Sequence, residues 1–279
     1  MSRLGSHFRI SRRGMFLAIV VLACVLPLLW TLLASVQILP DAIHTPPQWE
    51  FELSLDQYLE VGIVQPDFML KVFTSLLVAT GTTLLATTIG FFAAYSLARS
   101  RFRGRASVVQ SFLVLACLPV ISYLIPLSKL MDTLRLTDTI TGIVLAETAL
   151  YSPLAVYVLF GYFHSISIEM EESARLEGAS LLRTLRSVVL PACLTGVVAT
   201  AIILFVLSWN QLLIPLRIAT PHVNTIPTAM IDFFTFEREL DWPTAAAALI
   251  VSLLPIALVV ALAHRALEQF SLDISHHKT

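Results

Sequence analysis

The polar stretch between the fourth and fifth apolar segments carries the side chains whose types and spacing point most clearly to a defined task. Glu169, Glu171 and Glu172 fall near the start of a predicted helix that Ser167 can cap. Carboxylates suit that position because the first turn of a helix carries a partial positive charge. Gly178 then permits the chain to break and turn.

A second short helix is predicted after this turn, with Ser180 as its cap. Its apolar residues recur at the spacing of one helical face: Leu181, Leu182, Leu185, Val188 and Val189. Pro191 can then occupy the first position of the next membrane helix. The expected unit is a helix, a glycine turn and a helix, held at both ends by membrane segments. Such a unit suits an element on which another protein pushes.

The same stretch resembles the cytoplasmic loop of permease subunits in bacterial ABC importers. That loop reads E-A-A, three residues, G, nine residues, I-x-L-P. Here Glu172-Ser173-Ala174 takes the first part, Gly178 follows after three residues, and Val188-Val189-Leu190-Pro191 follows after nine. Ser173 replaces the first alanine and Val188 replaces the isoleucine. The competing interpretation is an ordinary amphipathic loop between membrane helices.

The resemblance implies that this loop couples the chain to a separate ATPase. The residues that it assigns to coupling are Glu171, Glu172, Ser173, Ala174, Gly178, Ala179, Ser180, Leu190 and Pro191.

Composition favours an all-α, polytopic membrane protein. Hydrophobic residues make up 57% of the chain and charged residues 13%, whereas soluble domains average about 25% charged residues. Six apolar segments are long enough to cross a bilayer as helices. We expect the spans at 15–36, 72–97, 106–130, 140–163, 191–216 and 243–267, with the coupling loop at 164–190 and polar tails at 1–14 and 268–279.

The basic residues predict the orientation of these spans. Thirteen of the 18 lysines and arginines fall on the side that holds both termini and Gly178, and five fall on the other. Because basic residues accumulate on the cytoplasmic side, both termini and the Gly178 turn are expected inside the cell. The strongest contribution comes from Arg99, Arg101, Arg103 and Arg105, which we interpret as a topology signal.

No nucleotide-binding loop occurs in this chain. Its three lysines follow Leu, Ser or His, so the Gly-Lys pair of a phosphate-binding loop is absent. Any ATP and magnesium would therefore be bound by a partner. The cysteines and histidines show no metal-ligand spacing, no catalytic cluster is recognised, and no run suggests nucleic-acid binding.

Further segments resemble the permeases of carbohydrate importers of the maltose-transporter type. These are the run 93–105, Gly161-Tyr162-Phe163, and the Ser208–Leu216 stretch, in which Asn210 matches and Gln211 replaces the usual acid. The resemblance covers roughly residues 15–267 and is closest to the smaller, MalG-like permease. It implies the type I importer permease fold and the inner membrane of a bacterium. It also implies a sugar-like solute, a second MalF-like permease, an ATPase dimer and an extracytoplasmic binding protein.

Four polar residues fall in predicted spans: Glu147, Tyr151, Asn210 and Gln211. They could line a solute path, where amides and hydroxyls meet sugar hydroxyls. They could equally form helix–helix hydrogen bonds, since a carboxylate in a bilayer needs a partner or water. Pro119, Pro126 and Pro153 could kink or break their helices.

Two other classes of function remain open at this point. A secondary transporter or channel working alone would show inverted repeats or buried coupling charges. We find no repeat, and Glu147 is the one acid well inside a span. A membrane-embedded enzyme would gather a His, Ser or acid cluster at one membrane face, and no such cluster is recognised.

Overall fold

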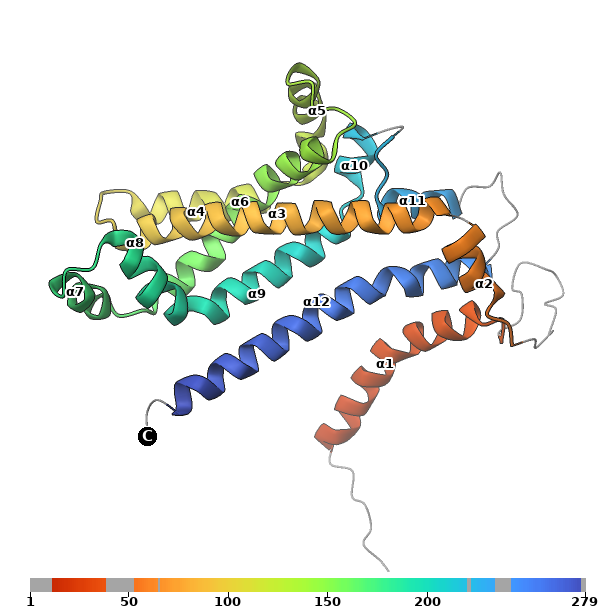
Figure 1. Ribbon diagram of the computed structural model, residues 1–279, viewed down its shortest axis with the longest axis horizontal. Helices are drawn as coiled ribbons and strands as arrows, with labels where there is room; N and C mark the ends of the chain where they lie inside the picture. The colour runs from red at the N-terminus through yellow and green to blue at the C-terminus, as the bar shows by residue number, and fades with distance from the viewer. Residues whose placement is uncertain (1–11, 39–52, 65, 220–221, 234–241, 277–279) are drawn as a thin grey trace, which may run out of the picture. The chain divides into compact units, whose positions relative to one another are not determined.

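The computed structural model describes residues 12–38, 53–64, 66–219, 222–233 and 242–276, and the described residues form helices and their connections without strands (Figure 1). The helices are α1 (Arg12–Ser35), α2 (Asp56–Leu59), α3 (Pro66–Arg99), α4 (Arg105–Ala116), α5 (Leu124–Thr133), α6 (Ile140–His164), α7 (Ile168–Leu176), α8 (Leu181–Thr184), α9 (Leu190–Trp209), α10 (Leu213–Ile218), α11 (Ile226–Phe233) and α12 (Trp242–His276). Two π-helical turns, Glu60–Val64 and Leu185–Val189, and one 3₁₀ turn, Val120–Ser122, complete the list.

The chain divides into two compact units. The first comprises residues 1–66 and 233–253, and the second comprises residues 67–232 and 254–279. In the first unit, α1 carries an apolar surface that this chain leaves exposed. The Ser35 Oγ at its end lies 2.6 Å from the Tyr58 hydroxyl of α2.

The core of the second unit lies where α3, α6 and α9 pack together. Phe91 and Phe163 meet edge to face, with ring centroids 5.1 Å apart, and Leu159 and Val189 beside them are fully buried. Glycine permits the closest approach: a β-carbon on Gly196 would lie 2.3 Å from the ring of Tyr162. Small residues at helix contacts are a common solution in membrane proteins, because they let the backbones approach.

Five helices in the described part of the chain are long and apolar enough to cross a membrane. They are Gly14–Ser35, Asp67–Arg99, Ile140–His164, Leu181–Trp209 and Trp242–Ala263. Each overlaps a predicted span, so the polytopic helical fold is confirmed. The number of six spans remains a prediction.

The predicted span 106–130 is not a single helix, and this part of the prediction is wrong. Helix α4 ends at Ala116, the 3₁₀ turn follows Pro119, and α5 begins at Leu124. Proline has no backbone N–H and disfavours helical geometry in the residue before it, so an apolar run interrupted there need not stay one helix. By contrast, Pro153 lies inside α6, which continues past it.

The predicted span 191–216 is also shifted. The apolar helix begins at Leu181, passes through the π-turn Leu185–Val189, and ends at Trp209. The second half of the coupling loop is therefore continuous with a membrane helix. Asn210 and Gln211 consequently lie beyond its end, in the break before α10.

Candidate functional site

The predicted coupling loop has the expected local geometry, with α7 and α8 joined by a tight turn at Gly178. Ser167 Oγ accepts a hydrogen bond from the Glu169 amide at 3.2 Å. Ser180 Oγ accepts one from the Arg183 amide at 3.4 Å. Both predicted caps are thus present, and each satisfies a backbone donor that the first turn of a helix leaves unpaired.

Gly178 ends α7 in a Schellman motif. Its amide donates to the Arg175 carbonyl at 2.9 Å, and the Ala179 amide donates to the Ala174 carbonyl at 3.0 Å. Its φ is +84°, a backbone conformation that costs a residue with a β-carbon roughly 1–2 kcal/mol. Apart from Gly178 and its two chain neighbours, no atom of the described residues lies within 4 Å of where that β-carbon would be, so the space around the turn is open.

Glu171 points into the protein. Its side chain is 3% exposed, and Arg99 at the end of α3 approaches its Oε1 to 2.6 Å. The Tyr95 hydroxyl, one helical turn earlier on α3, donates to Oε2 at 2.8 Å. Arg175 of α7 in turn donates to the Tyr95 hydroxyl at 3.3 Å. We call Tyr95, Arg99, Glu171 and Arg175 the anchor cluster.

The anchor cluster also reaches the end of α6. Arg99 Nη1 donates to the Phe163 carbonyl at 3.2 Å, and Nη2 donates to the Ile166 carbonyl at 3.4 Å. These carbonyls belong to the last turn of α6 and the residues after it, where unpaired carbonyls and the helix dipole favour a cation. One guanidinium therefore ties together α3, the end of α6 and α7.

The sequence alone did not identify this cluster. Arg99 was interpreted as a topology signal and Tyr95 was given no role, while Glu171 was assigned to contact with a partner. The available signal was spacing: Tyr95 and Arg99 on α3, and Glu171 and Arg175 on α7, are both i, i+4 pairs and so share a helix face.

The opposite surface of the loop is exposed and partly apolar. Leu176 is 90% exposed and Leu182 is 71% exposed. Glu172, which follows the buried Glu171, is also exposed. The remaining predicted coupling residues differ in burial: Ser173 and Ser180 are exposed, whereas Ala174, Ala179, Leu190 and Pro191 are half-buried.

The apolar stripe expected on the second helix therefore divides into two parts. Leu181 and Leu182 face solvent, while Leu185 and Val189 are buried in the core between α3, α6 and α9. A π-helical turn at Leu185–Val189 changes the angular position of the residues that follow. The same run of apolar residues therefore contributes both to the exposed surface of the loop and to the buried core.

Glu147 and Tyr151 are enclosed within the second unit. Glu147 is fully buried and accepts hydrogen bonds from Ser208 of α9 and, at 3.4 Å, from Thr82 of α3. The Tyr151 hydroxyl donates to the Leu207 carbonyl at 3.1 Å. These contacts are interhelical hydrogen bonds, the alternative to a solute path that the sequence left open.

The two amides beyond α9 differ from each other. Gln211 donates to the Tyr151 hydroxyl at 3.0 Å and accepts from the Leu213 amide at 3.1 Å, so both ends of its side chain are used inside the chain. Asn210 is exposed, and its amide nitrogen donates to the Val206 carbonyl at 2.8 Å. Of the four residues considered for the solute path, Asn210 is the most accessible.

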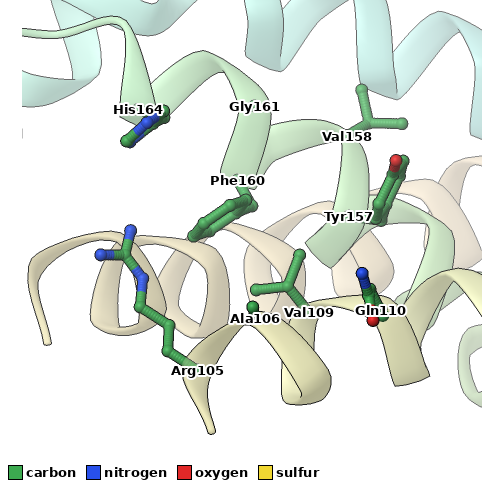
Figure 2. A pocket seen from close by; sticks show the side chains of 9 residues that line it. All are labelled: Arg105, Ala106, Val109, Gln110, Tyr157, Val158, Phe160, Gly161 and His164. Carbon is green, nitrogen blue, oxygen red and sulfur yellow. The ribbon is translucent and has the colours of Figure 1, made fainter. Parts of the chain in front are cut away.

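A groove of about 730 Å³ lies between α4 and α6 (Figure 2). Arg105 extends over the ring of Phe160 at 5.1 Å, and His164 stacks against the same ring with centroids 6.1 Å apart. The lining is mostly apolar, as expected for a surface near lipid. No group of three metal-ligating side chains occurs in the ranges that the structure describes.

Comparison with known proteins places this geometry in a family. Residues 86–271, which include α6 to α9 and the whole coupling loop, match the family of binding-protein-dependent transport system inner membrane components. The chain is 30% identical to the sulfoquinovosyl glycerol transport system permease protein SmoH of Agrobacterium fabrum, over 84% of this chain and 82% of that protein. It is 33% identical to the trehalose transport system permease protein SugB of Mycobacterium tuberculosis, over 73% and 76% of the two chains.

The fold is also found in a solved structure. A chain of a bacterial ABC transporter that imports the acidic polysaccharide alginate superposes with a TM-score of 0.66 at 18% identity, covering 94% of this chain and 99% of that one. From the family match and these relatives, the chain belongs to the binding-protein-dependent transport system inner membrane components, the non-catalytic permease subunits of ABC importers.

Proposed function

We propose that the chain is one of two permease subunits of an ATP-driven importer and that the loop from α7 to α8 is its docking element for a separate ATPase. The subunit would form half of the translocation pathway for a sugar or sugar-like solute. ATP and magnesium would be bound by the ATPase. The sugar class is supported by the names of the relatives, which transport a sulfoquinovosyl glycerol and trehalose.

The observation that carries the proposal is the exposure of Leu176 and Leu182. Leu176 lies in α7, outside the candidate spans, and Leu182 lies in the first turn of the span Leu181–Trp209. Exposed leucines grouped on one surface mark a contact with another molecule. Glu172 beside them offers a carboxylate to a basic group on that partner, and the open space at Gly178 allows close approach.

The other expected partners follow from the family. A binding-protein-dependent system requires an extracytoplasmic solute-binding protein, and one permease provides half of a pathway, so a second permease subunit completes it. The basic residues support a cytoplasmic position for the loop and both termini. Asn210 is proposed to face the solute path, since it is the exposed member of the four polar residues.

The test replaces the exposed leucines. In a Leu176→Ser, Leu182→Ser variant, co-purification of the cognate ATPase with the subunit should fall strongly, since each buried leucine contributes about 1.5–3 kcal/mol to a contact. Leu134→Ser is the matched control, because Leu134 is 53% exposed directly after α5, far in sequence from the loop. It should leave co-purification unchanged. Undiminished co-purification of the double leucine variant would refute the proposal.

A further inference from the structure

The anchor cluster gives α7 a rigid connection that its chain neighbours do not provide. Only Ser165, Ile166 and Ser167 join α7 to α6, and the glycine turn joins it to α8. A nine-residue helix on such links could rock when a partner pushes on it. The Arg99–Glu171 pair prevents this by joining α7 directly to α3 and to the end of α6.

We propose that Arg99 and Tyr95 are positioning residues that, through Glu171, make α7 move as one body with α3 and the end of α6. A displacement of the loop by the ATPase then reaches the membrane helices instead of being absorbed by the links. This inference rests on the proposed function. It assigns a role in energy transmission to residues that need not touch the ATPase.

The hydrogen-bond geometry fits a rigid link. Arg99 Nε and Nη2 both point at Oε1 of Glu171, at 2.8 and 2.6 Å, while Tyr95 occupies Oε2. All three guanidinium nitrogens have acceptors, since Nη1 binds the Phe163 carbonyl. A planar guanidinium held at several points fixes orientation as well as distance, which a lysine ammonium cannot do.

Burial makes the link resistant to breaking. The side chains of Arg99 and Glu171 are 15% and 3% exposed, so water and salt screen the pair little. Removing one partner leaves a charge uncompensated in a buried place, which is strongly unfavourable. The pair should therefore remain closed while the loop is pushed.

Neighbouring glutamates separate docking from transmission. Successive residues on an α-helix point about 100° apart, so the buried direction of Glu171 leaves Glu172 exposed. A defect at Glu172 should weaken binding of the ATPase. A defect at Glu171 or Arg99 should leave the ATPase bound and disturb the movement of α7.

The experiment uses the complete transporter, assembled with its cognate second permease and ATPase in lipid. Nitroxide labels are placed at two exposed positions outside the predicted coupling residues, Ile89→Cys on α3 and Met170→Cys on α7. The distance between the two labels is measured by pulsed electron paramagnetic resonance in two states of the transporter. One state has no nucleotide, and the other is trapped with Mg-ATP and vanadate. In the otherwise unaltered protein we expect one narrow distance that is the same in both states.

Arg99→Gln or Glu171→Gln should lose this single narrow distance, while the ATPase co-purifies in normal amount. Arg99→Lys should keep the narrow distance only in part, because lysine retains the positive charge but lacks the planar guanidinium with its several N–H donors. Arg101→Gln is the matched control, since Arg101 is an exposed arginine of the same basic turn, and it should behave as the unaltered protein. Glu172→Gln should keep the narrow distance and reduce co-purification.

The double variant Arg99→Gln, Glu171→Gln separates transmission from folding. It leaves no uncompensated charge, so it should reach the membrane in normal amount even if a single variant does not, yet the distance should remain broad. A narrow, unchanged distance in this variant would overturn the proposal, as would a nucleotide-dependent α3–α7 distance in the unaltered protein. Failure of any ATPase to co-purify with the unaltered subunit would instead contradict the proposed function.

Discussion

The two ends of α6 are each held by a carboxylate, in contrasting surroundings. Before the first turn, Asp138 accepts hydrogen bonds from the Val223 amide at 2.9 Å and the His222 amide at 3.1 Å, and it lies 2.6 Å from the His222 ring. After the last turn, Glu171 is held by Arg99 and Tyr95. The His222 side chain is 82% exposed, whereas the Arg99 side chain is 15% exposed.

The difference shows how environment decides what one chemical group does. The Asp138 contact is open to water, where ion pairs contribute little to stability and respond to salt and pH. The Glu171 contact is closed, where the pair is costly to break. One end of α6 can therefore adjust its neighbouring loop, while the other end is held firmly to α3 and α7.

The largest expected effect comes from breaking the buried pair on one side only. Glu171→Ala leaves Arg99 without its carboxylate, and the loss of one partner in a buried ion pair costs about 3–5 kcal/mol. Thermal unfolding of the purified subunit in detergent should show a clear fall in Tm. Glu172→Ala, at the exposed neighbouring position, should leave the Tm nearly unchanged. Equal Tm values for the two variants would contradict the claim that the buried carboxylate of Glu171 stabilises the subunit more than the exposed carboxylate of Glu172.

Gly178→Leu should have a smaller effect on the subunit and a marked effect on coupling. The φ of +84° strains a residue with a side chain by roughly 1–2 kcal/mol. Bulk at a closely packed contact costs a further 1–3 kcal/mol or so. Since the space is open in the isolated chain, the variant should still insert, while co-purification of the ATPase and its stimulated hydrolysis fall together. Normal hydrolysis would mean that the turn is a mere connector.

Substitution of Gln211 should affect stability, whereas substitution of Asn210 should affect transport. Gln211→Ala removes hydrogen bonds to Tyr151 and Leu213, each worth about 0.5–1.5 kcal/mol net, so it should lower the Tm. Asn210→Ala should leave the Tm unchanged and alter the apparent affinity of uptake. An unaltered uptake by the Asn210 variant would place the solute path elsewhere.

The smallest effect is expected at the exposed end of α6. The Val223 amide, helped by His222, lowers the pKa of Asp138 below its ordinary value. A depressed folded pKa contributes stability above the unfolded pKa, and that contribution is lost as pH falls through the folded value. The protection factor of the Val223 amide, which compares its exchange rate with the intrinsic rate at the same pH, should therefore fall on acidification. Asp138→Asn should remove most of this pH dependence, and a pH dependence that persists would assign it to another group.

Local features of the coupling loop were predictable, because they depend on neighbours in sequence. The Ser167 and Ser180 caps and the Gly178 turn all follow from residue type and spacing, and all are present. The direction of Glu171 was not predictable in the same way. Its partner Arg99 is 72 residues away, so only the packing of α3 against α7 decides that Glu171 is buried and Glu172 is exposed.

The errors in the predicted spans have a different origin. Hydropathy reports whether a segment prefers lipid, and it does not report whether its backbone stays helical. The run 106–130 is apolar enough to look like one span, yet it breaks at Pro119. Likewise, the prediction places Leu181–Val189 in the loop because Pro191 can start the next helix, although this segment is helically continuous with α9.

The central claim, that the exposed surface of the loop docks on the ATPase, is tested most directly by site-specific cross-linking. A photoreactive amino acid is placed at Leu176, which is 90% exposed, and in a separate variant at Leu134, which is 53% exposed directly after α5. After illumination of the assembled transporter, we predict a covalent product with the ATPase from position 176 and none from position 134. A product from position 134, or none from position 176, would contradict the account.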